Sequence, residues 1–224
     1  MGFRQKILFH LVHLKKLDNK TAKELIKSGK VKVNDTIVFE NQILNKTDNL
    51  YLNNELIRKG MKHTYIRYHK PVGIECTMDK ENPDSVYHIF KHLNLPLQIC
   101  GRLDKASEGL LLLTTDGSWN KKITRPEFEK EKEYLVTVSK EIDRKFCNLM
   151  SSGIDIGGYV TKPCECNLVD ATSFKIILKE GRNKQIRRMC KKLDNLVTRL
   201  IRLRINNIEL KDLEPGCFEM LKNI

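Results

Sequence analysis

A continuous apolar run bounded by glycines constrains the fold of this chain more than any other feature. The segment from Gly101 to Gly117 reads GRLDKASEGLLLLTTDG, and its leucine run, Leu110 to Leu113, is too short for a typical helix. A short apolar run between turn residues indicates a strand buried on both faces, so we expect it at the centre of a sheet. Asp104 lies just before this run, and an acid beside a buried strand requires either a partner or a function.

Other segments predict further strands around this one. Tyr65 to Tyr68, Glu133 to Val138 and Phe174 to Leu178 each suit a strand, and the second places Tyr134 on a buried face. A late helix is predicted with Asn183 as its cap. Its apolar stripe consists of Ile186, Met189, Cys190 and Leu193. Because strands outnumber helices, we predict an α+β fold on a mixed, mostly antiparallel sheet.

A smaller α/β module is expected before this sheet, ending near residue 62. Thr21 and Glu24 have the spacing of a capping box at the start of a helix, which should end at Ser28-Gly29. An alternating strand from Val31 to Val33, a turn at Asn34-Asp35 and a return strand follow. The corner between helix and strand carries four lysines, Lys23, Lys27, Lys30 and Lys32.

Positive charge is concentrated in two blocks of the sequence. The formal net charge is +13, of which residues 1–62 contribute +7 from 13 Lys and Arg against 6 Asp and Glu. Residues 179–204 contribute +8 from 10 against 2, so the rest of the chain is nearly neutral. Two basic blocks around a near-neutral body indicate that a polyanion such as RNA is bound at two places, although a solubilising surface is the alternative.

Several other classes of protein fit the sequence poorly. No apolar stretch approaches the length of a membrane span, and the stretch from Met1 to Leu17 lacks the continuous apolar core of an export signal. The seven cysteines are scattered, and the close pair Cys164 and Cys166 has no further ligands at metal-site spacing. We therefore expect a cytoplasmic protein with no bound metal, and buried thiols in a strand at that pair.

Ordered motifs then point to two known families. The stretch TAKELIKSGKVKVND, Thr21 to Asp35, resembles the S4 RNA-binding domain, which implies a small module that docks on structured RNA. The segment from Gly101 to Gly117 resembles the catalytic motif of the RsuA-type pseudouridine synthases. Three more of that family's motifs are matched by KPVG from Lys70, KEYLV from Lys132 and GRNKQIRRMC from Gly181.

The resemblance covers nearly the whole chain and departs from the family pattern at His69, where asparagine is usual. It implies an S4-like domain over residues 1–62 and a pseudouridine synthase domain over residues 63–224. The amino-acid sequence of residues 131–138 and 182–190 is most similar to that of the F-type synthases of large-subunit (23S) ribosomal RNA.

The reaction that the family catalyses suits the residues present. Conversion of uridine to pseudouridine breaks a C–N glycosidic bond and remakes it as a C–C bond, without gain or loss of atoms. It therefore requires no energy cofactor, and the chain contains neither a P-loop nor a dinucleotide fingerprint. A carboxylate can serve as nucleophile or as base while the uracil is detached, so Asp104 is the predicted essential acid, with its step left open.

Two further side chains are predicted to complete the catalytic site. Desolvation favours protonation of an acid, and a nearby guanidinium opposes it. On a helical wheel Arg187 lies at the edge of the apolar stripe, whereas Arg188 points away from it, so Arg187 is the predicted partner of Asp104. Tyr134 could be an ordinary core residue, but the family match favours stacking on the uracil and proton exchange.

The remaining predicted contacts are with RNA. A uridine inside folded RNA must be flipped out, and the resemblance implies that Arg102 fills the gap it leaves, with a phosphate contact as the alternative. The matched motifs also imply RNA contacts by Lys70, Arg182 and Arg188. The expected substrate is large-subunit ribosomal RNA and the expected state a monomer without membrane contact. The alternatives are a synthase of small-subunit (16S) or transfer RNA, or a non-catalytic S4-type ribosome-assembly factor.

Overall fold

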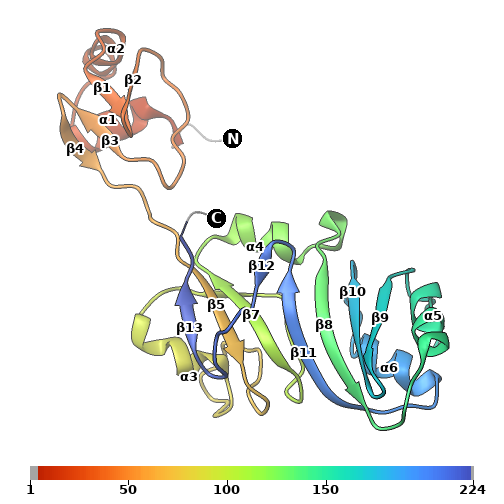
Figure 1. Cartoon of the computed structure of the whole chain (residues 1–224). Coiled ribbons are helices and arrows are strands. Elements are labelled where there is room, and N and C mark those ends of the chain that lie inside the picture. Colours follow the sequence, from red (N-terminus) through yellow and green to blue (C-terminus); the bar gives the residue numbers. More distant parts are fainter. Residues whose placement is uncertain (1–4, 223–224) are drawn as a thin grey trace. The chain divides into compact units, whose positions relative to one another are not determined.

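The structure is a computed structural model that describes residues 5–222. It forms two compact units, residues 1–63 and 64–224 (Figure 1). Residues 1–4 of the N-terminal stretch considered above lie outside the described residues. No described helix is long and apolar enough to cross a membrane.

The N-terminal unit packs two helices against a four-stranded antiparallel sheet with the order β2-β1-β3-β4. Its elements are α1 (Ile7–Lys15), α2 (Asn19–Lys27), β1 (Val31–Val33), β2 (Thr36–Val38), β3 (Leu50–Leu52) and β4 (Glu55–Arg58). Ile7, Leu11, Ile26, Val31 and Leu50 form its core and are almost inaccessible to solvent. The predicted strand, turn and return strand after α2 are confirmed by β1 and β2.

The predicted capping box at the start of α2 is wrong. The helix begins at Asn19, and the carboxylate of Asp18 accepts hydrogen bonds from the backbone N–H groups of Lys20 and Thr21. The Thr21 hydroxyl also donates to Asp18, at 2.7 Å, from within the first turn. An aspartate three residues earlier therefore takes the cap position, because its carboxylate can accept all three of these hydrogen bonds. The predicted end of the helix, at Ser28-Gly29, is confirmed.

The C-terminal unit is built on one large sheet with the strand order β13-β5-β7-β11-β8-β10-β9. Its strands are β5 (Tyr65–Lys70), β6 (Gln98–Cys100), β7 (Glu108–Thr114), β8 (Lys132–Val138), β9 (Glu165–Asp170), β10 (Ser173–Leu178), β11 (Val197–Ile205), β12 (Ile208–Glu209) and β13 (Phe218–Met220). Strands β7 and β11 run parallel, whereas the other neighbours in this order run antiparallel. The predicted α+β fold on a mixed, mostly antiparallel sheet is confirmed.

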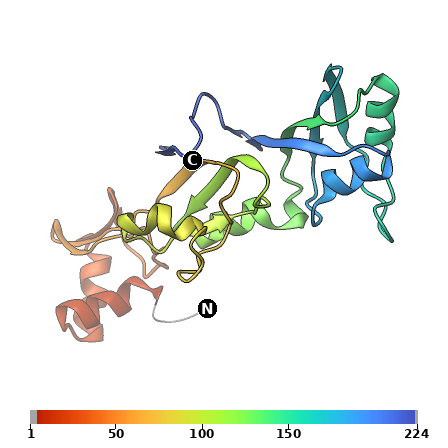
Figure 2. The same ribbon diagram turned by 90° about the horizontal axis from the view of Figure 1, so that it is seen from below.

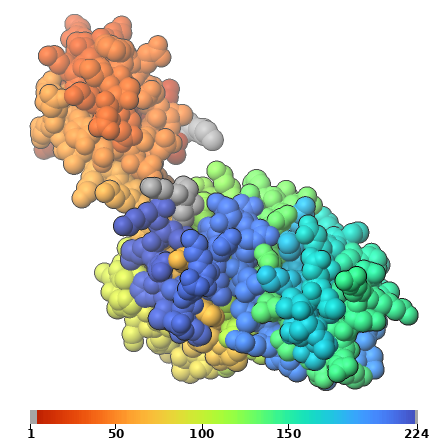
Figure 3. Space-filling view, viewed as in Figure 1, coloured from red at the N-terminus to blue at the C-terminus, as the bar shows by residue number. Residues whose placement is uncertain are grey.

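The helices of this unit are distributed along the sheet. They are α3 (Val86–Phe90), α4 (Gly117–Thr124), α5 (Arg144–Ser152) and α6 (Gln185–Lys192), with short 3-10 turns at Lys91–Leu93 and Pro126–Phe128. Figure 2 shows α3 and α4 beside β5 and β7, and α5 and α6 at the end of the sheet formed by β9 and β10. In the space-filling view the C-terminal segment, in dark blue, lies over β5, with which β13 pairs (Figure 3).

Strand β7 is the central strand that the leucine run predicts, and every one of its residues is buried. Because side chains alternate along a strand, its leucines face two different clusters. Leu111 and Leu113 pack with residues of β5 and α3, whereas Leu110 and Leu112 pack with residues of α4 and β11. Burial on both sides fixes strand β7, which directly follows the loop that carries Asp104.

Strand β8 and helix α6 build the neighbouring core. Tyr134, Val136 and Val138 share the buried face of β8, as predicted, and the apolar stripe of α6 packs against them. The predicted cap of α6 by Asn183 is wrong. The N-cap residue is Lys184, in the left-handed conformation with φ of 48°, and it makes no side-chain capping bond.

Candidate active site

Asp104 lies in the loop between β6 and β7, one residue after the buried Leu103. The backbone N–H of Ser107 donates to the carbonyl oxygen of Asp104 at 3.0 Å, which closes a turn over residues 104–107. The Asp104 side chain is half-buried. Within residues 5–222 no hydrogen bond or ion pair reaches its carboxylate, so its oxygens remain available for a ligand.

Two neighbouring cavities meet at this carboxylate. The first, which we call the tyrosine pocket, has a volume of about 230 Å³, and its lining includes Asp104, Tyr134, Leu200 and Arg202. The second, the cationic pocket, has a volume of about 470 Å³, and its lining includes Lys105, Arg182 and Lys184. Arg102 and Asp104 line both. The tyrosine pocket also has cations in its wall, among them Arg182 and Lys184, which line the cationic pocket too. An aromatic ring surrounded by positive charge suits a base and its phosphates, respectively.

Tyr134 is 9% exposed and lies on β8 with its side chain in the tyrosine pocket. It also belongs to the core cluster with Val136 and Ile186, so it is both a core residue and part of the pocket wall. Its ring is fixed by core packing while one part of it lines the cavity. A ring held in this way is suitable for stacking on a planar base.

Arg187 lies close to Asp104 in the fold but does not form the predicted pair. Its guanidinium donates to the carbonyl oxygens of Ala106, at 2.9 Å, and Val197, at 3.1 Å, and to the Ser107 hydroxyl at 3.3 Å. No ion pair with Asp104 occurs among residues 5–222. The helical wheel correctly placed Arg187 at the edge of the buried face and Arg188 outside it. It could not show that the Ala106 carbonyl and the Ser107 hydroxyl of the 104–107 turn, and the Val197 carbonyl, would accept the guanidinium donors.

Lys70 does not have the RNA-binding position predicted from the sequence. Its side chain is fully buried, and its ammonium donates to the carbonyl oxygens of Pro71 and Ile74, both at 2.8 Å. Burial lowers the pKa of this lysine. We therefore correct its role to a structural one, in which it fixes the turn after β5.

The other predicted RNA contacts lie at accessible positions. Arg102 and Arg182 are exposed, and the Arg182 guanidinium lies 4.0 Å from the centre of the Tyr159 ring. Arg188 is exposed and donates to the carbonyl oxygen of Ile156. In the N-terminal unit Lys23, Lys27 and Lys30 are exposed and Lys32 is half-buried.

The sequence analysis gave no role to Arg202 and Lys132, two of the cations that line the tyrosine pocket. Arg202 on β11 is only 1% exposed, and Lys132 on β8 is half-buried two residues before Tyr134. Burial and the nearby Arg202 lower the pKa of the Lys132 ammonium. A signal for Arg202 was present, because it follows Leu200 at a spacing of two and so lies on the same strand face as a buried leucine. In the sequence, Arg202 also belongs to the basic block of residues 179–204.

Comparison with known proteins shows to which family the chain is similar. Residues 64–192 match the family model described as RNA pseudouridylate synthase. The chain is 37% identical over 197 residues to the dual-specificity RNA pseudouridine synthase RluF of Escherichia coli K12, covering 87% of this chain and 68% of that protein. It is 32% identical over 210 residues to the ribosomal small subunit pseudouridine synthase A of Haemophilus influenzae, covering 92% and 90%.

A solved structure supports the same assignment. A crystal structure of a pseudouridylate synthase superimposes with a TM-score of 0.68 at 30% sequence identity, covering 97% of this chain and 96% of that one. The predicted resemblance to the RsuA-type synthases, and to the F type in particular, is confirmed by these relatives. The chain therefore belongs to the RNA pseudouridylate synthase family.

Proposed function

We propose that this pseudouridine synthase isomerises a uridine of large-subunit ribosomal RNA, as a cytoplasmic monomer, with Asp104 as its essential carboxylate. The unpartnered position of Asp104 between two pockets is the observation that carries this proposal. A structural aspartate would be expected to accept hydrogen bonds from neighbouring N–H groups, whereas a reactive one keeps its oxygens free for the substrate.

The two pockets suggest how a flipped uridine would bind. Its base enters the tyrosine pocket against Tyr134 and Leu200, and the flanking phosphates meet the cations of the cationic pocket. Arg102 lines both cavities and is exposed, so it is suitably placed to occupy the gap in the RNA stack. Arg187 supports the site indirectly, because it fixes the turn that follows Asp104.

The chemistry then requires little more than a fixed acid. The C1′–N1 bond of the uridine breaks, the uracil turns, and C1′ bonds to C5, which loses its proton as N1 gains one. Asp104 assists as nucleophile or base while the base is detached. The S4-like module, residues 1–62, is proposed to anchor the RNA through its basic corner.

The choice of ribosomal RNA rests on the named relatives. The RluF relative supports large-subunit RNA as the substrate, because it fits the resemblance to the F-type synthases. The small-subunit synthase, however, is matched over a greater share of its own length, 90% against 68% for RluF. Small-subunit RNA is therefore the second candidate. Mapping pseudouridines in both ribosomal RNAs and in transfer RNA, from cells with and without the gene, decides between them.

Substitution of the acid tests the proposed catalytic role. We expect Asp104→Asn to bind target RNA as the wild type does but to lower turnover by at least about 10³-fold, because the amide has lost its nucleophilic or basic oxygen. The measurement is release of tritium from uracil C5 in the RNA.

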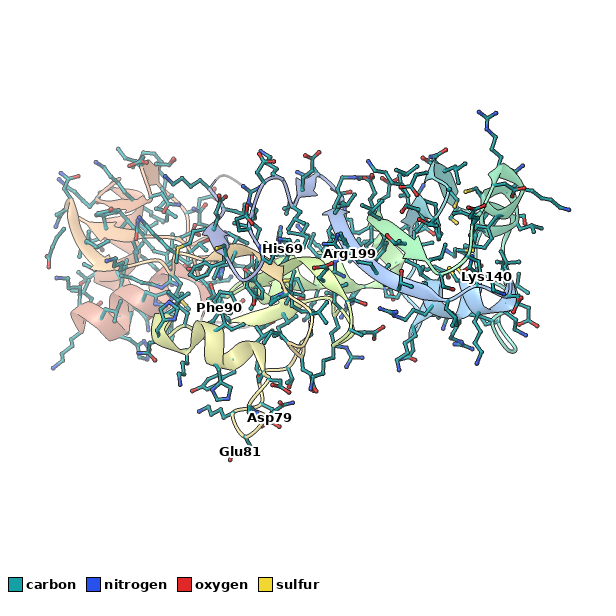
Figure 4. All side chains as sticks on the ribbon, turned by 60° about the horizontal axis from the view of Figure 1, so that its bottom comes forward. His69, Asp79, Glu81, Phe90, Lys140 and Arg199 are labelled. Carbon is teal, nitrogen blue, oxygen red and sulfur yellow. The ribbon has the colours of Figure 1, made fainter. Side chains whose placement is uncertain are left out.

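Asp79→Asn provides the matched control. Figure 4 shows Asp79 near the tip of a loop that projects from the unit, and it lines neither pocket. Turnover should be unchanged in this variant. If Asp104→Asn keeps its turnover, Asp104 does not have the proposed role, and if the wild type binds target RNA without releasing tritium, the enzyme assignment itself fails.

A further inference from the structure

Arg202 is a buried cation without an acidic partner. Its side chain is 1% exposed, and a guanidinium so far from water normally pairs with a carboxylate. Arg204 on the same strand, with a side chain only 19% exposed, shows this normal behaviour, since it pairs with Glu131 and Glu133. Even Arg199, which is exposed, pairs with Glu108. Among residues 5–222 no carboxylate lies within ion-pair distance of Arg202, so its charge remains uncompensated.

The Arg202 guanidinium binds main-chain oxygens instead. Its Nε donates to the carbonyl oxygen of Leu110 at 2.7 Å, and Nη1 donates to the carbonyl oxygen of Arg102 at 3.2 Å. The first bond joins β11 to β7, and the second reaches the segment that carries Asp104 two residues later. Nη2 is buried and has no hydrogen-bond partner within the described residues. Arg202 thus connects the rigid centre of the sheet to the catalytic loop.

The backbone at this point is also closely fitted. In the parallel pair of β7 and β11, Arg202 lies opposite Gly109. A Cβ atom on Gly109 would lie 2.4 Å from the Arg202 carbonyl oxygen, so the two strands approach as closely as they do only because residue 109 is glycine. Arg202 is therefore held firmly enough to fix the position of a loop bonded to it.

The side chain also contributes positive charge behind the pocket wall. It lines the tyrosine pocket, and its strand partner across the sheet is Tyr134. Lys70 and Lys132, two further buried or half-buried cations, are close enough for the Arg202 charge to lower their pKa values, with burial as the larger cause in both. Arg202 and Lys132 thus place positive charge in the wall of the tyrosine pocket, which Asp104 also lines.

We propose that Arg202 is a positioning residue of the reaction, which acts by tying the Arg102–Asp104 segment to β7 so that the Asp104 carboxylate meets the flipped uridine in a fixed place. The inference rests on the proposed role of Asp104. Small displacements of a catalytic group lower a rate strongly while leaving most binding contacts intact. Arg202 is therefore expected to affect turnover more than RNA affinity.

The test compares Arg202→Gln and Arg202→Lys with the wild type. The measurements are the single-turnover rate of tritium release at saturating RNA, expressed per RNA-binding site, and the dissociation constant for the same RNA. We expect Arg202→Gln to lower the rate by about 10²-fold, with RNA affinity changed by less than about threefold. Arg202→Lys should recover part of the loss, because an ammonium can donate to two carbonyl oxygens, as Lys70 does in this fold.

Arg204→Gln is the matched control, since Arg204 lies two residues further along β11 and lines neither pocket. It should lower stability without changing the rate per binding site. The inference is overturned if Arg202→Gln turns over at the wild-type rate, or if both glutamine variants lose the same factor.

If Arg202→Gln folds poorly, the rate of Arg202→Lys per RNA-binding site tests the inference instead. In that case a rate per binding site equal to that of the wild type overturns the inference, and a loss of about 10-fold with unchanged affinity supports it. Failure of the proposed function is distinguishable, because it would appear as an inactive wild type.

Discussion

Two aspartates near the ends of β7 have opposite environments, and the contrast shows what distinguishes a reactive side chain. Asp116 accepts hydrogen bonds from the backbone N–H groups of Ser118 and Trp119, and from the hydroxyls of Ser118 and Tyr65. The carboxylate of Asp104 receives none from residues 5–222. Both residues look alike in the sequence as acids beside the leucine run. Only their neighbours in space, which depend on β5, α4 and the 104–107 turn, separate the structural acid from the available one.

Gly109 is a second single residue whose substitution should have a clear effect, here on stability. Its φ of +107° and the approach of the Arg202 backbone both exclude a side chain. We expect Gly109→Ala to lower the free energy of unfolding by about 2–4 kcal/mol, from backbone strain and overpacking together. Urea unfolding measures this loss.

Gly117→Ala is the control for that substitution, because the first residue of α4 has ordinary contacts of 3.6 Å or more around an added Cβ. It should be neutral or slightly stabilising. Equal losses in the two variants would contradict the special role of the close strand approach.

Helix starts show which part of an element could be predicted from sequence. Apolar periodicity located the bodies of α2 and α6, since burial of one face depends on spacing alone. Their first residues were misplaced, because Asp18 precedes Thr21 as a cap and because Lys184 adopts a left-handed conformation. A cap depends on which of several nearby side chains reaches the free N–H groups, and local patterns do not rank these competitors.

Helix α4 has a cap whose effect depends on pH. Burial alone would raise the pKa of Asp116, but the hydrogen bonds from Ser118, Trp119 and Tyr65 lower it from 3.8 to about 2. The ionised cap therefore stabilises the fold above about pH 4, and this contribution is lost as the pH falls from 3.8 towards 2. Asp116→Ala should lower the free energy of unfolding by about 1–2 kcal/mol at pH 7, after allowance for solvent screening.

Urea unfolding between pH 7 and pH 3 tests this prediction. The difference between wild type and Asp116→Ala should stay constant down to about pH 4 and narrow below it. A difference that widens towards low pH would mean that the carboxyl is more readily protonated in the folded chain than in the unfolded one, contrary to its hydrogen bonds.

For the molecule as a whole, the sequence predicted the fold class and the segments that surround the site. It did not predict the hydrogen-bond partners of the side chains within the site. The central position of β7 and the common face of Tyr134 and Val136 followed from apolar patterning. Apolar patterning could not predict the partners of Lys70, Arg187 and Arg202, because each donates hydrogen bonds to main-chain oxygens that folding brings near. Such oxygens are present at every residue and carry no sequence signal.

The basic N-terminal unit leads to a prediction about RNA binding. We expect the combined replacement of Lys23, Lys27, Lys30 and Lys32 by glutamine to weaken RNA binding at least about 10-fold and to reduce its salt dependence, because fewer counterions are released. Turnover at saturating RNA should be unchanged. Filter binding at several salt concentrations provides the measurement.

The control variant loses the same amount of charge elsewhere, by replacement of Lys80, Lys91, Lys121 and Lys145 by glutamine. These lysines are exposed on the C-terminal unit and line neither the tyrosine pocket nor the cationic pocket. The control should have a much smaller effect. If both sets weaken binding equally, net charge rather than the basic corner of the N-terminal unit governs affinity.

The parallel pairing of β7 with β11 also has a consequence for biogenesis. Gly109 and Arg202 are neighbours across two strands but lie far apart along the chain, with β8, β9 and β10 synthesised between them. Contacts of such sequence separation form slowly, because a long loop must close first. A nascent chain can therefore complete its N-terminal unit and pack Leu111 and Leu113 against β5 and α3 while the Asp104 loop is still unanchored. If Arg202 has the proposed positioning role, the site is completed only after the ribosome has synthesised β11.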